Sequence, residues 1–268
     1  MSEGLILSAS SVEAYMSCGY GWYLQYIEQI AGEQSMEAAV GLSVHAGIEA
    51  YYKLRLRGAT PQEAAASSEP EEARLVTWLF ELPAILHSKD PLDKMEIVGG
   101  RVLAAYIEDV GAHVTPVLVE HPGIVTVNGI GYSYHVDLVD RGPKGRPRVR
   151  DTKVKGAKPS EVSRHLRQVV GYCLGVRVDM DEIEEDALID VMVRLKRDRP
   201  YYMPFSYGGP ISDRDIGVFA FNLVQVADGI EKKRFEPTGL EAGECKWCPV
   251  RESCEYLAEY TREMGDTK

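Results

Sequence analysis

Two aspartates and a lysine lie close together in the middle of the chain. Asp137 closes one predicted strand, and Asp151 lies on the next, so pairing of neighbouring strands would bring the two carboxylates to one edge of a sheet. Lys153 shares a strand face with Asp151, because strand side chains repeat every two residues. Two carboxylates, a main-chain carbonyl and waters are ligands that Mg²⁺ or Mn²⁺ prefers. A lysine there could orient an attacking water or stabilise charge on a phosphate.

Other polar residues could complete such a site. Gln168 and Tyr172 are four residues apart in a predicted helix and could hold a phosphate or Lys153 in register, although an ordinary half-buried helix face has the same pattern. His45 lies in an otherwise apolar helix, with Gly41 one turn earlier, where another element could approach closely. A lone helical histidine is usually a core or surface residue, but a neutral imidazole could ligate the same cation.

The five cysteines indicate a second type of metal chemistry. Cys245, Cys248 and Cys254 are close in sequence, and Cys18, among aromatic residues, is the natural fourth ligand. Cys173 is more simply a small buried residue. A zinc ribbon usually presents two Cys-x-x-Cys pairs, so this spacing favours an iron-sulfur cluster, with zinc as the alternative.

Charge is unevenly distributed along a chain of formal net charge -11. Between residues 141 and 158, the sequence has one acidic residue, Asp151, and eight basic residues. The basic residues are Arg141, Lys144, Arg146, Arg148, Arg150, Lys153, Lys155 and Lys158. We expect this cluster, with further basic residues at 164–167 and 194–199, to attract a phosphate backbone. Tyr201, Tyr202 and Phe205 could stack on bases or pack in the core. The acidic run at 179–186 is typical of a solvated turn.

Hydrophobic periodicity predicts an α/β protein with a mixed sheet. Helices are expected at residues 8–29, 36–56, 61–86, 93–109, about 160–178 and 213–233, and strands at 115–140, 147–154, 187–195 and 200–207. Asn128-Gly129 predicts a hairpin turn within the first strand region. With 268 residues the chain can bury a large core, and no apolar run is long enough to span a bilayer, so we expect a cytoplasmic protein.

The ordered set of these residues resembles the PD-(D/E)XK nucleases of the RecB type. The resemblance rests on His45, Asp137, Asp151-Thr152-Lys153, Gln168 and Tyr172, and on the four cysteines that flank them, so it covers residues 8 to 258. It extends to the iron-sulfur subgroup that includes the AddB nuclease domain and the CRISPR-associated Cas-four exonucleases. The chain departs from this pattern at Tyr134, where the family often has glycine, and at Gly19, where proline often follows the first cysteine.

This resemblance implies the fold and the roles of the site residues. It implies a restriction-endonuclease-like core with a mixed central sheet flanked by helices. His45, Asp137, Asp151 and the Thr152 carbonyl would bind Mg²⁺ or Mn²⁺, Lys153 would be catalytic, and Gln168 and Tyr172 would support the site. Glu120 falls near an acid of the family and is expected only to support the ligands. The four cysteines would hold a [4Fe-4S] cluster.

We therefore expect a single nuclease domain over residues 1–268. It would comprise a mainly helical region at 1–112, the PD-(D/E)XK core at 113–235 and a cysteine segment at 236–268 that closes onto Cys18. The implied activity is a metal-dependent DNA exonuclease acting on single strands or DNA ends in recombination, repair or CRISPR spacer processing. The alternatives are a DNA-binding subunit of a recombination or CRISPR-adaptation complex with little cleavage of its own, and a zinc-stapled nucleic-acid binder.

Overall fold

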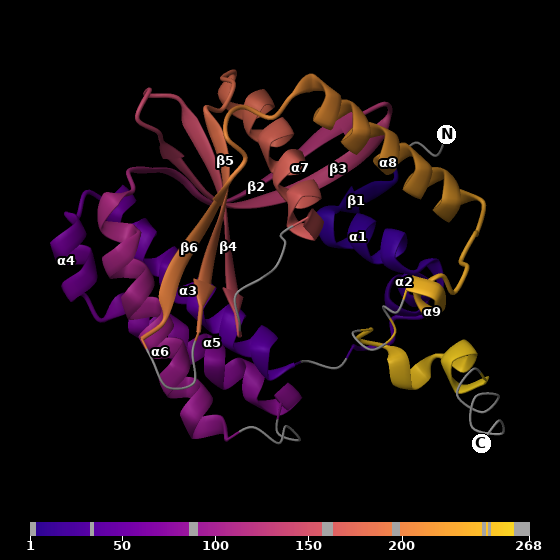
Figure 1. Ribbon diagram of the computed structural model, residues 1–268, viewed down its shortest axis with the longest axis horizontal. Helices are drawn as coiled ribbons and strands as arrows, with labels where there is room; N and C mark the ends of the chain where they lie inside the picture. The colour runs from indigo at the N-terminus through magenta and orange to yellow at the C-terminus, as the bar shows by residue number, and fades with distance from the viewer. Residues whose placement is uncertain are drawn as a thin grey trace. The chain divides into compact units, whose positions relative to one another are not determined.

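The fold comprises two compact units, each built from separate stretches of sequence. The computed structural model describes residues 4–32, 35–85, 91–156, 163–194, 199–242, 245 and 248–259, and Figure 1 shows its helices and strands. The larger unit contains residues 34–123 and 134–216, and the smaller contains 1–33, 124–133 and 217–268. The residues predicted to bind the catalytic cation belong to the larger unit and the cysteines of the predicted cluster to the smaller. The prediction of one domain stays a prediction.

The larger unit is built on a mixed sheet, as the sequence predicted. Strands β3 (Ile130–Arg141), β4 (Pro147–Lys155), β5 (Asp186–Val193) and β6 (Tyr201–Ser206) are neighbours in that order, and β2 (Pro116–Val127) pairs with β3. The β4–β5 pair is parallel, whereas β3–β4 and β5–β6 are antiparallel. Asn128 and Gly129 join β2 to β3 with φ values of 51° and 84°, the left-handed pair expected of a type I′ hairpin turn.

Helices pack on this sheet to form the core of the larger unit. They are α3 (Met36–Leu56), α4 (Pro61–Ala66), α5 (Glu69–Ile85), α6 (Leu92–Asp109), the short helix η1 (Gly111–His113) and α7 (Ser163–Met180). The core buries Tyr51 and Tyr52 of α3, Trp78 of α5 and Tyr106 of α6 together with Leu138 of β3. Large aromatic side chains dominate this core, and each contributes more buried area than an aliphatic residue.

Local sequence signals explain where two of these helices begin. The Ser35 hydroxyl caps α3 by accepting from the Ala38 amide, and Thr60 and Glu63 form a capping box on α4. The close approach expected at Gly41 occurs instead at Gly47. A Cβ at Gly41 would meet nothing within 4 Å, whereas one at Gly47 would lie 2.5 Å from Leu103 and 2.9 Å from the Pro70 carbonyl oxygen.

The smaller unit is assembled from both ends of the chain. It contains β1 (Ile6–Ser8), α1 (Ala9–Ser17), α2 (Gly19–Tyr26), most of α8 (Asp213–Glu231), α9 (Gly239–Ala242) and the short helix η3 (Arg251–Ser253). β1 pairs in parallel with residues 131–133 of β3. Trp22 packs on Phe235, with ring centroids 5.7 Å apart, which ties α2 to the segment after α8. None of the helices in the described stretches is both long and apolar enough to cross a membrane.

The helix predicted over residues 8–29 is interrupted by one extended residue. Cys18 has φ −164° and ψ 112°, and it separates α1 from α2. Its side chain accepts a hydrogen bond from the Gly21 amide and so caps α2. Hydrophobic periodicity is the same on both sides of this residue, so it could not reveal the break. The strand β1 was also not predicted, because three residues are too few to show an alternation.

Part of the basic cluster is neutralised within the fold, so the expectation that it attracts DNA is wrong for the buried Arg150, whereas Lys144 and Arg146 are exposed. Arg150 donates to Asp190 at 2.8 Å and to Asp140 at 3.2 Å, and both carboxylates are fully buried. Arg148 also pairs with Asp140. The acids lie on the neighbouring strands β3 and β5, which the local sequence could not show. Lys158, Lys196 and Arg197 lie outside the described residues.

Part of the acidic run is likewise built into the fold, so its prediction as a solvated turn is wrong for Glu184 and Glu185, which are buried, whereas Asp181 is exposed. Glu184 is fully buried and pairs with Arg177 at 2.7 Å. Glu185 is buried and accepts from the Lys144 amide at 2.9 Å, while Glu182 pairs with Arg141 at 2.6 Å. Acidic residues that have no basic neighbour in the sequence therefore have basic or backbone partners in the folded structure.

The buried ion pairs predict a large stability difference between two arginine variants. Arg150→Met leaves Asp190 buried without its guanidinium, so we expect the free energy of unfolding to fall by about 3–5 kcal/mol. Arg141→Met breaks a partly exposed pair with Glu182 and should cost about 0–1 kcal/mol. Urea denaturation measures both. Equal, small losses in the two variants would contradict a structural role for the Arg150 network.

Candidate metal and catalytic site

The candidate site lies in the larger unit, where β3 and β4 diverge. The antiparallel register of these strands pairs residues 138–141 with 147–150. Just before it, the Asp137 carboxylate accepts a hydrogen bond from the Thr152 amide at 2.9 Å. The carboxylate thus joins the two strands at the point where their ladder ends, and it keeps Asp137 beside the Asp151-Thr152-Lys153 segment.

His45 approaches the same point from α3. Its Nδ1 lies 3.6 Å from Asp137 Oδ2, and its Nε2 lies 2.6 Å from the Thr152 carbonyl oxygen. Two neighbouring ligands of an octahedral Mg²⁺ are about 3 Å apart, given bonds of about 2.1 Å. The 2.6 Å contact is a hydrogen bond between the imidazole and the carbonyl group, so these two ligand atoms lie side by side.

Glu120 of β2 is the residue that sequence reasoning undervalued. Ligand atoms of His45, Glu120 and Asp137 all lie within 4.8 Å of one another, so this group could hold a metal ion. Burial, assisted by the Asp137 carboxylate, raises the pKa of Glu120 to about 7. Glu120 also has a φ of 48°, in the left-handed region that is unusual for glutamate and recurs at functional sites. Neither its spacing nor its neighbours could have shown this backbone conformation.

Asp151 and Lys153 form a buried ion pair next to this group. Asp151 is fully buried, and its Oδ1 accepts from Lys153 Nζ at 2.8 Å. Burial raises the pKa of Asp151 to about 6, although the Lys153 ammonium acts in the opposite direction. Burial also lowers the pKa of Lys153, but Asp151 and Asp137 outweigh it and raise the pKa above its usual value. Lys153 is therefore an ammonium at neutral pH and cannot serve as a base in this state.

The second oxygen of Asp151 tests whether a hard cation fits this site. Asp151 Oδ2 is buried and has no hydrogen-bond partner among the described residues. A buried carboxylate oxygen without a partner costs free energy that a bound cation would recover. The available donors are carboxylate oxygens, an imidazole nitrogen and a carbonyl oxygen, and this set suits Mg²⁺ or Mn²⁺ rather than a soft metal.

Gln168 and Tyr172 lie on α7 and bond to each other. Gln168 Nε2 donates to the Tyr172 hydroxyl, so the two side chains share one face of the helix, as their spacing predicted. Their roles beside Lys153 stay a prediction.

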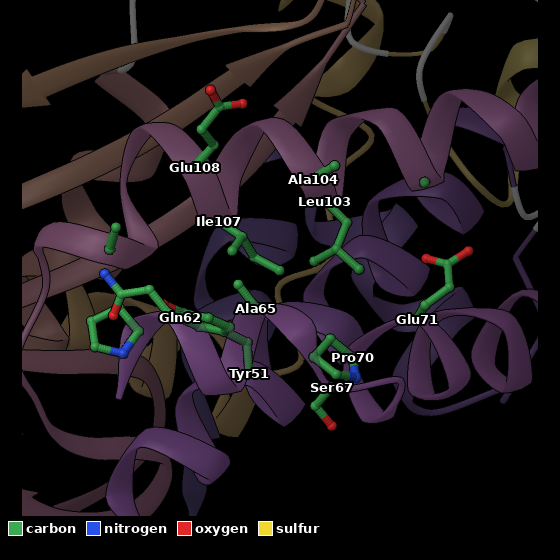
Figure 2. A pocket seen from close by; sticks show the side chains of 13 residues that line it. Tyr51, Gln62, Ala65, Ser67, Pro70, Glu71, Leu103, Ala104, Ile107 and Glu108 are labelled. Carbon is green, nitrogen blue, oxygen red and sulfur yellow. The ribbon is translucent and has the colours of Figure 1, made fainter. Parts of the chain in front are cut away.

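A cavity in the larger unit is separate from these residues. It has a volume of about 440 Å³ and lies between α6 and the segment that contains α4 and the start of α5 (Figure 2). Leu103, Ala104 and Ile107 line one side, and Tyr51 lies at its floor. It shares no lining residue with the candidate site, and the Tyr51 hydroxyl is shielded from solvent. The lining is mostly apolar and includes the carboxylates of Glu71 and Glu108, but none of the predicted site residues.

A family model matches this chain, and two solved structures are similar to it. The family model described as "PD-(D/E)XK nuclease superfamily" matches residues 6–255. A solved structure from Eubacterium rectale described as "Putative exonuclease" is 14% identical, with a TM-score of 0.53, and the match covers 87% of this chain and 83% of that one. The structure titled "Crystal structure of SSO0001" is also 14% identical, covers 96% and 89%, and has a TM-score of 0.45. A comparison with curated protein sequences gave no match.

The raised carboxyl pKa values predict that Mn²⁺ binding releases protons. With pKa values of about 7 for Glu120 and about 6 for Asp151, both groups are partly protonated at pH 6.5 in the metal-free protein. A cation binds the ionised forms, so binding should displace protons, and affinity should fall as pH is lowered from about 7.5 to 5.5. Calorimetry in two buffers of different protonation enthalpy measures the release.

Two glutamate variants make this measurement specific. Glu120→Gln should reduce the number of protons released, whereas Glu231→Gln, on the exposed surface of α8, should leave it unchanged. A binding enthalpy that is the same in both buffers for the unmodified protein would refute the coupling.

Proposed function

Since the chain belongs to the PD-(D/E)XK nuclease superfamily, we propose that it is a metal-dependent DNA exonuclease that acts on single strands or DNA ends. The observation that carries this proposal is the fully buried Asp151 with one unpartnered oxygen. A protein that only bound DNA would gain nothing from such a carboxylate, because it is costly to bury and repels phosphate. A site that binds a cation, by contrast, requires a carboxylate oxygen that can bind the cation.

The ligands of the cation would be Asp137, Asp151, His45 and the Thr152 carbonyl, with Glu120 as a further carboxylate. When bound, Mg²⁺ or Mn²⁺ supplies a Lewis acid for the phosphoryl oxygen and lowers the pKa of a bound water. The charge of the carboxylates alone would repel the DNA backbone, so the cation also makes the approach of phosphate favourable.

Lys153 would act as a fixed positive charge and hydrogen-bond donor. Its ion pair with Asp151 holds the ammonium beside the ligands, and its side chain keeps a fifth of its surface exposed, so it can reach substrate. There it would donate to a non-bridging phosphate oxygen or to the attacking water, where negative charge develops in the transition state. The Gln168–Tyr172 pair would orient the phosphate from α7.

The four cysteines of the smaller unit support a [4Fe-4S] cluster of the AddB and Cas-four type. A Cβ built on Gly21 would lie 3.7 Å from the sulfurs of both Cys18 and Cys248. A Cβ on Gly239 would lie 3.5 Å from the Cys18 sulfur and 3.6 Å from the Cys245 sulfur. Glycine at these two positions leaves the sulfurs free of side-chain crowding. Burial and the neighbouring cysteines raise the pKa of Cys245, because clustered thiolates repel one another. A bound metal ion would relieve this repulsion.

The spacing of the cysteines in the sequence favours iron-sulfur over zinc. A zinc ribbon usually presents two Cys-x-x-Cys pairs, whereas this chain has Cys18 alone and a group of three cysteines near its other end.

Gly19 fits the same arrangement, although the family often has proline there. A Cβ at Gly19 would lie 3.2 Å from backbone atoms of Phe235 and Glu236, and the Tyr20 amide donates to the Glu236 carbonyl at 3.1 Å. The chain that leads to Cys245 therefore passes directly against the residue that follows Cys18, so the departure at Gly19 lets the two cysteine segments pack together.

A cleavage assay tests the proposed activity. Single-stranded DNA labelled at the 5′ or the 3′ end is incubated with Mn²⁺ and either the unmodified protein or Lys153→Ala, under anaerobic conditions. We expect the unmodified protein to shorten the strand, the label to give the polarity, and Lys153→Ala to lower the rate by about 100-fold or more, because a transition-state donor is lost. Lys232→Ala, which changes an exposed lysine just after α8, should cut normally.

Two results would change the assignment. If the unmodified protein and Lys153→Ala cut equally, Lys153 is not catalytic. If neither cuts but both bind DNA, the protein is a binding or processing subunit, such as one in recombination or CRISPR adaptation, and its cleavage requires a partner.

A second experiment tests the cluster. Protein purified anaerobically should be brown and contain about four irons and four sulfides per chain. Cys248→Ser should lose the colour and lower the melting temperature, because cluster binding is coupled to folding. Cys173→Ala, which changes a buried cysteine of the larger unit, should keep the colour. Colourless protein with one zinc per chain would show that the cysteines bind zinc instead.

A further inference from the structure

We propose that Tyr134 of β3 is a positioning residue that sets the rotation of α7, and through it the orientation of Gln168 and Tyr172. The proposal rests on the function proposed for that pair. Tyr134 stands where the family often has glycine, so this chain places a large ring at a position that the resemblance left without a role.

The Tyr134 ring lies between two glycines on different elements. A Cβ built on Gly123 of β2 would be 2.2 Å from the ring Cζ and the hydroxyl oxygen. A Cβ on Gly175 of α7 would be 2.4 Å from Cε1 and Cζ. Both distances are far below van der Waals contact, so a side chain at either position would force the Tyr134 ring to move. Tyr134 is buried, and its ring thus separates β2 from α7 by a defined thickness.

The Tyr134 hydroxyl also bonds to α7. It donates to Asp179 Oδ2, and the same oxygen lies 2.7 Å from His121 Nε2 of β2. Burial acts to raise the pKa of Asp179, but the hydrogen bonds from Tyr134 and His121 outweigh it and hold the pKa below its usual value. An ionised Asp179 near the C-terminal end of α7 is therefore bonded to β2 and β3 at once.

The face of α7 that meets Tyr134 is the face that carries the predicted site residues. Gln168, Tyr172, Gly175 and Asp179 follow one another at intervals of four, three and four residues. At 3.6 residues per turn, these positions form a single stripe along the helix. Along the helix axis, Gln168 lies about 10 Å and Tyr172 about 5 Å from Gly175. Any rotation of α7 that relieved a clash at Gly175 would therefore turn both side chains by the same angle.

Tyr134 also connects α7 to the metal site through β3. It lies three residues before Asp137 on β3, so a short, hydrogen-bonded piece of strand connects the contact with α7 to a predicted metal ligand. A residue that only filled space would need neither the two glycines nor the shared carboxylate. The combination fixes both how close α7 lies and how it is turned.

Substitutions on both sides of the contact test the proposal. Gly175→Ala adds a methyl group against the ring and should lower kcat for single-stranded DNA by about 100-fold, the effect of moving site groups by about 1 Å. KM should stay within about twofold. The double variant Tyr134→Ala with Gly175→Ala removes the clash and should recover at least about tenfold of that loss. Gly217→Ala is the matched control, since its Cβ would meet nothing within 4 Å.

Tyr134→Phe provides a variant that keeps the ring and the fold. It removes the hydrogen bond to Asp179 and should lower kcat by about fivefold, the equivalent of one ordinary hydrogen bond. Hydrogen-deuterium exchange should increase in the last two turns of α7 and remain unchanged in α3. Mn²⁺ affinity should be the same in all variants, because no predicted ligand is altered.

The outcomes separate this proposal from the proposed function. A folded Gly175→Ala that cuts with normal kcat, or a double variant no faster than Gly175→Ala, would overturn the role of Tyr134 even if the protein is a nuclease. If the unmodified protein cuts no DNA, the proposed function fails, and exchange in Tyr134→Phe still decides whether Tyr134 restrains α7. Unchanged exchange there would overturn the restraint itself.

Discussion

The site depends on the burial of the Asp151 carboxylate. Removed from water, an ionised carboxylate is stable only with a cation beside it, and the fold supplies the Lys153 ammonium at one oxygen. The other oxygen has no partner in the described structure. Asp137 and His45 lie close enough to Asp151 to affect its pKa, and Glu120 lies within 4.8 Å of both of them. The arrangement is electrostatically unfavourable as it stands and becomes favourable when a hard cation binds.

The remaining charge of β4 stabilises the sheet. Strand side chains alternate, so Arg148 and Arg150 point to the opposite face from Asp151 and Lys153. On that face Arg150 lies between Asp140 of β3 and Asp190 of β5, and Tyr202 of β6 donates to Asp190 at 2.7 Å. One short strand therefore carries a buried structural network on one side and the candidate site on the other. The network aligns β4 with its neighbours, which is what places the carboxylates together.

The two units carry ligands for different kinds of metal. The larger unit offers carboxylate and carbonyl oxygens with one imidazole, which suit Mg²⁺ or Mn²⁺, and the smaller offers thiols, which suit iron or zinc. The chemical softness of each ligand set would direct each metal to its own site. In the smaller unit, the thiol sites include residues from both ends of the chain, so a bound metal there would stabilise a contact between distant segments.

Sequence alone determined the ligand types, most elements and the mixed sheet. Helix α3 begins and ends at the residues predicted from the sequence, and Asn128-Gly129 forms the predicted turn, because these signals act over a few residues. Reasoning from residue types and spacing identified His45, Asp137, Asp151 and Lys153, and the family resemblance added Thr152; the structure brings these residues close together. Tertiary structure decided the rest. Glu120 joined the site through an unusual backbone angle, Tyr134 found its glycines on two other elements, and the basic and acidic runs found each other across strands. These features depend on contacts between residues far apart in sequence, and local propensity carries no information about such contacts.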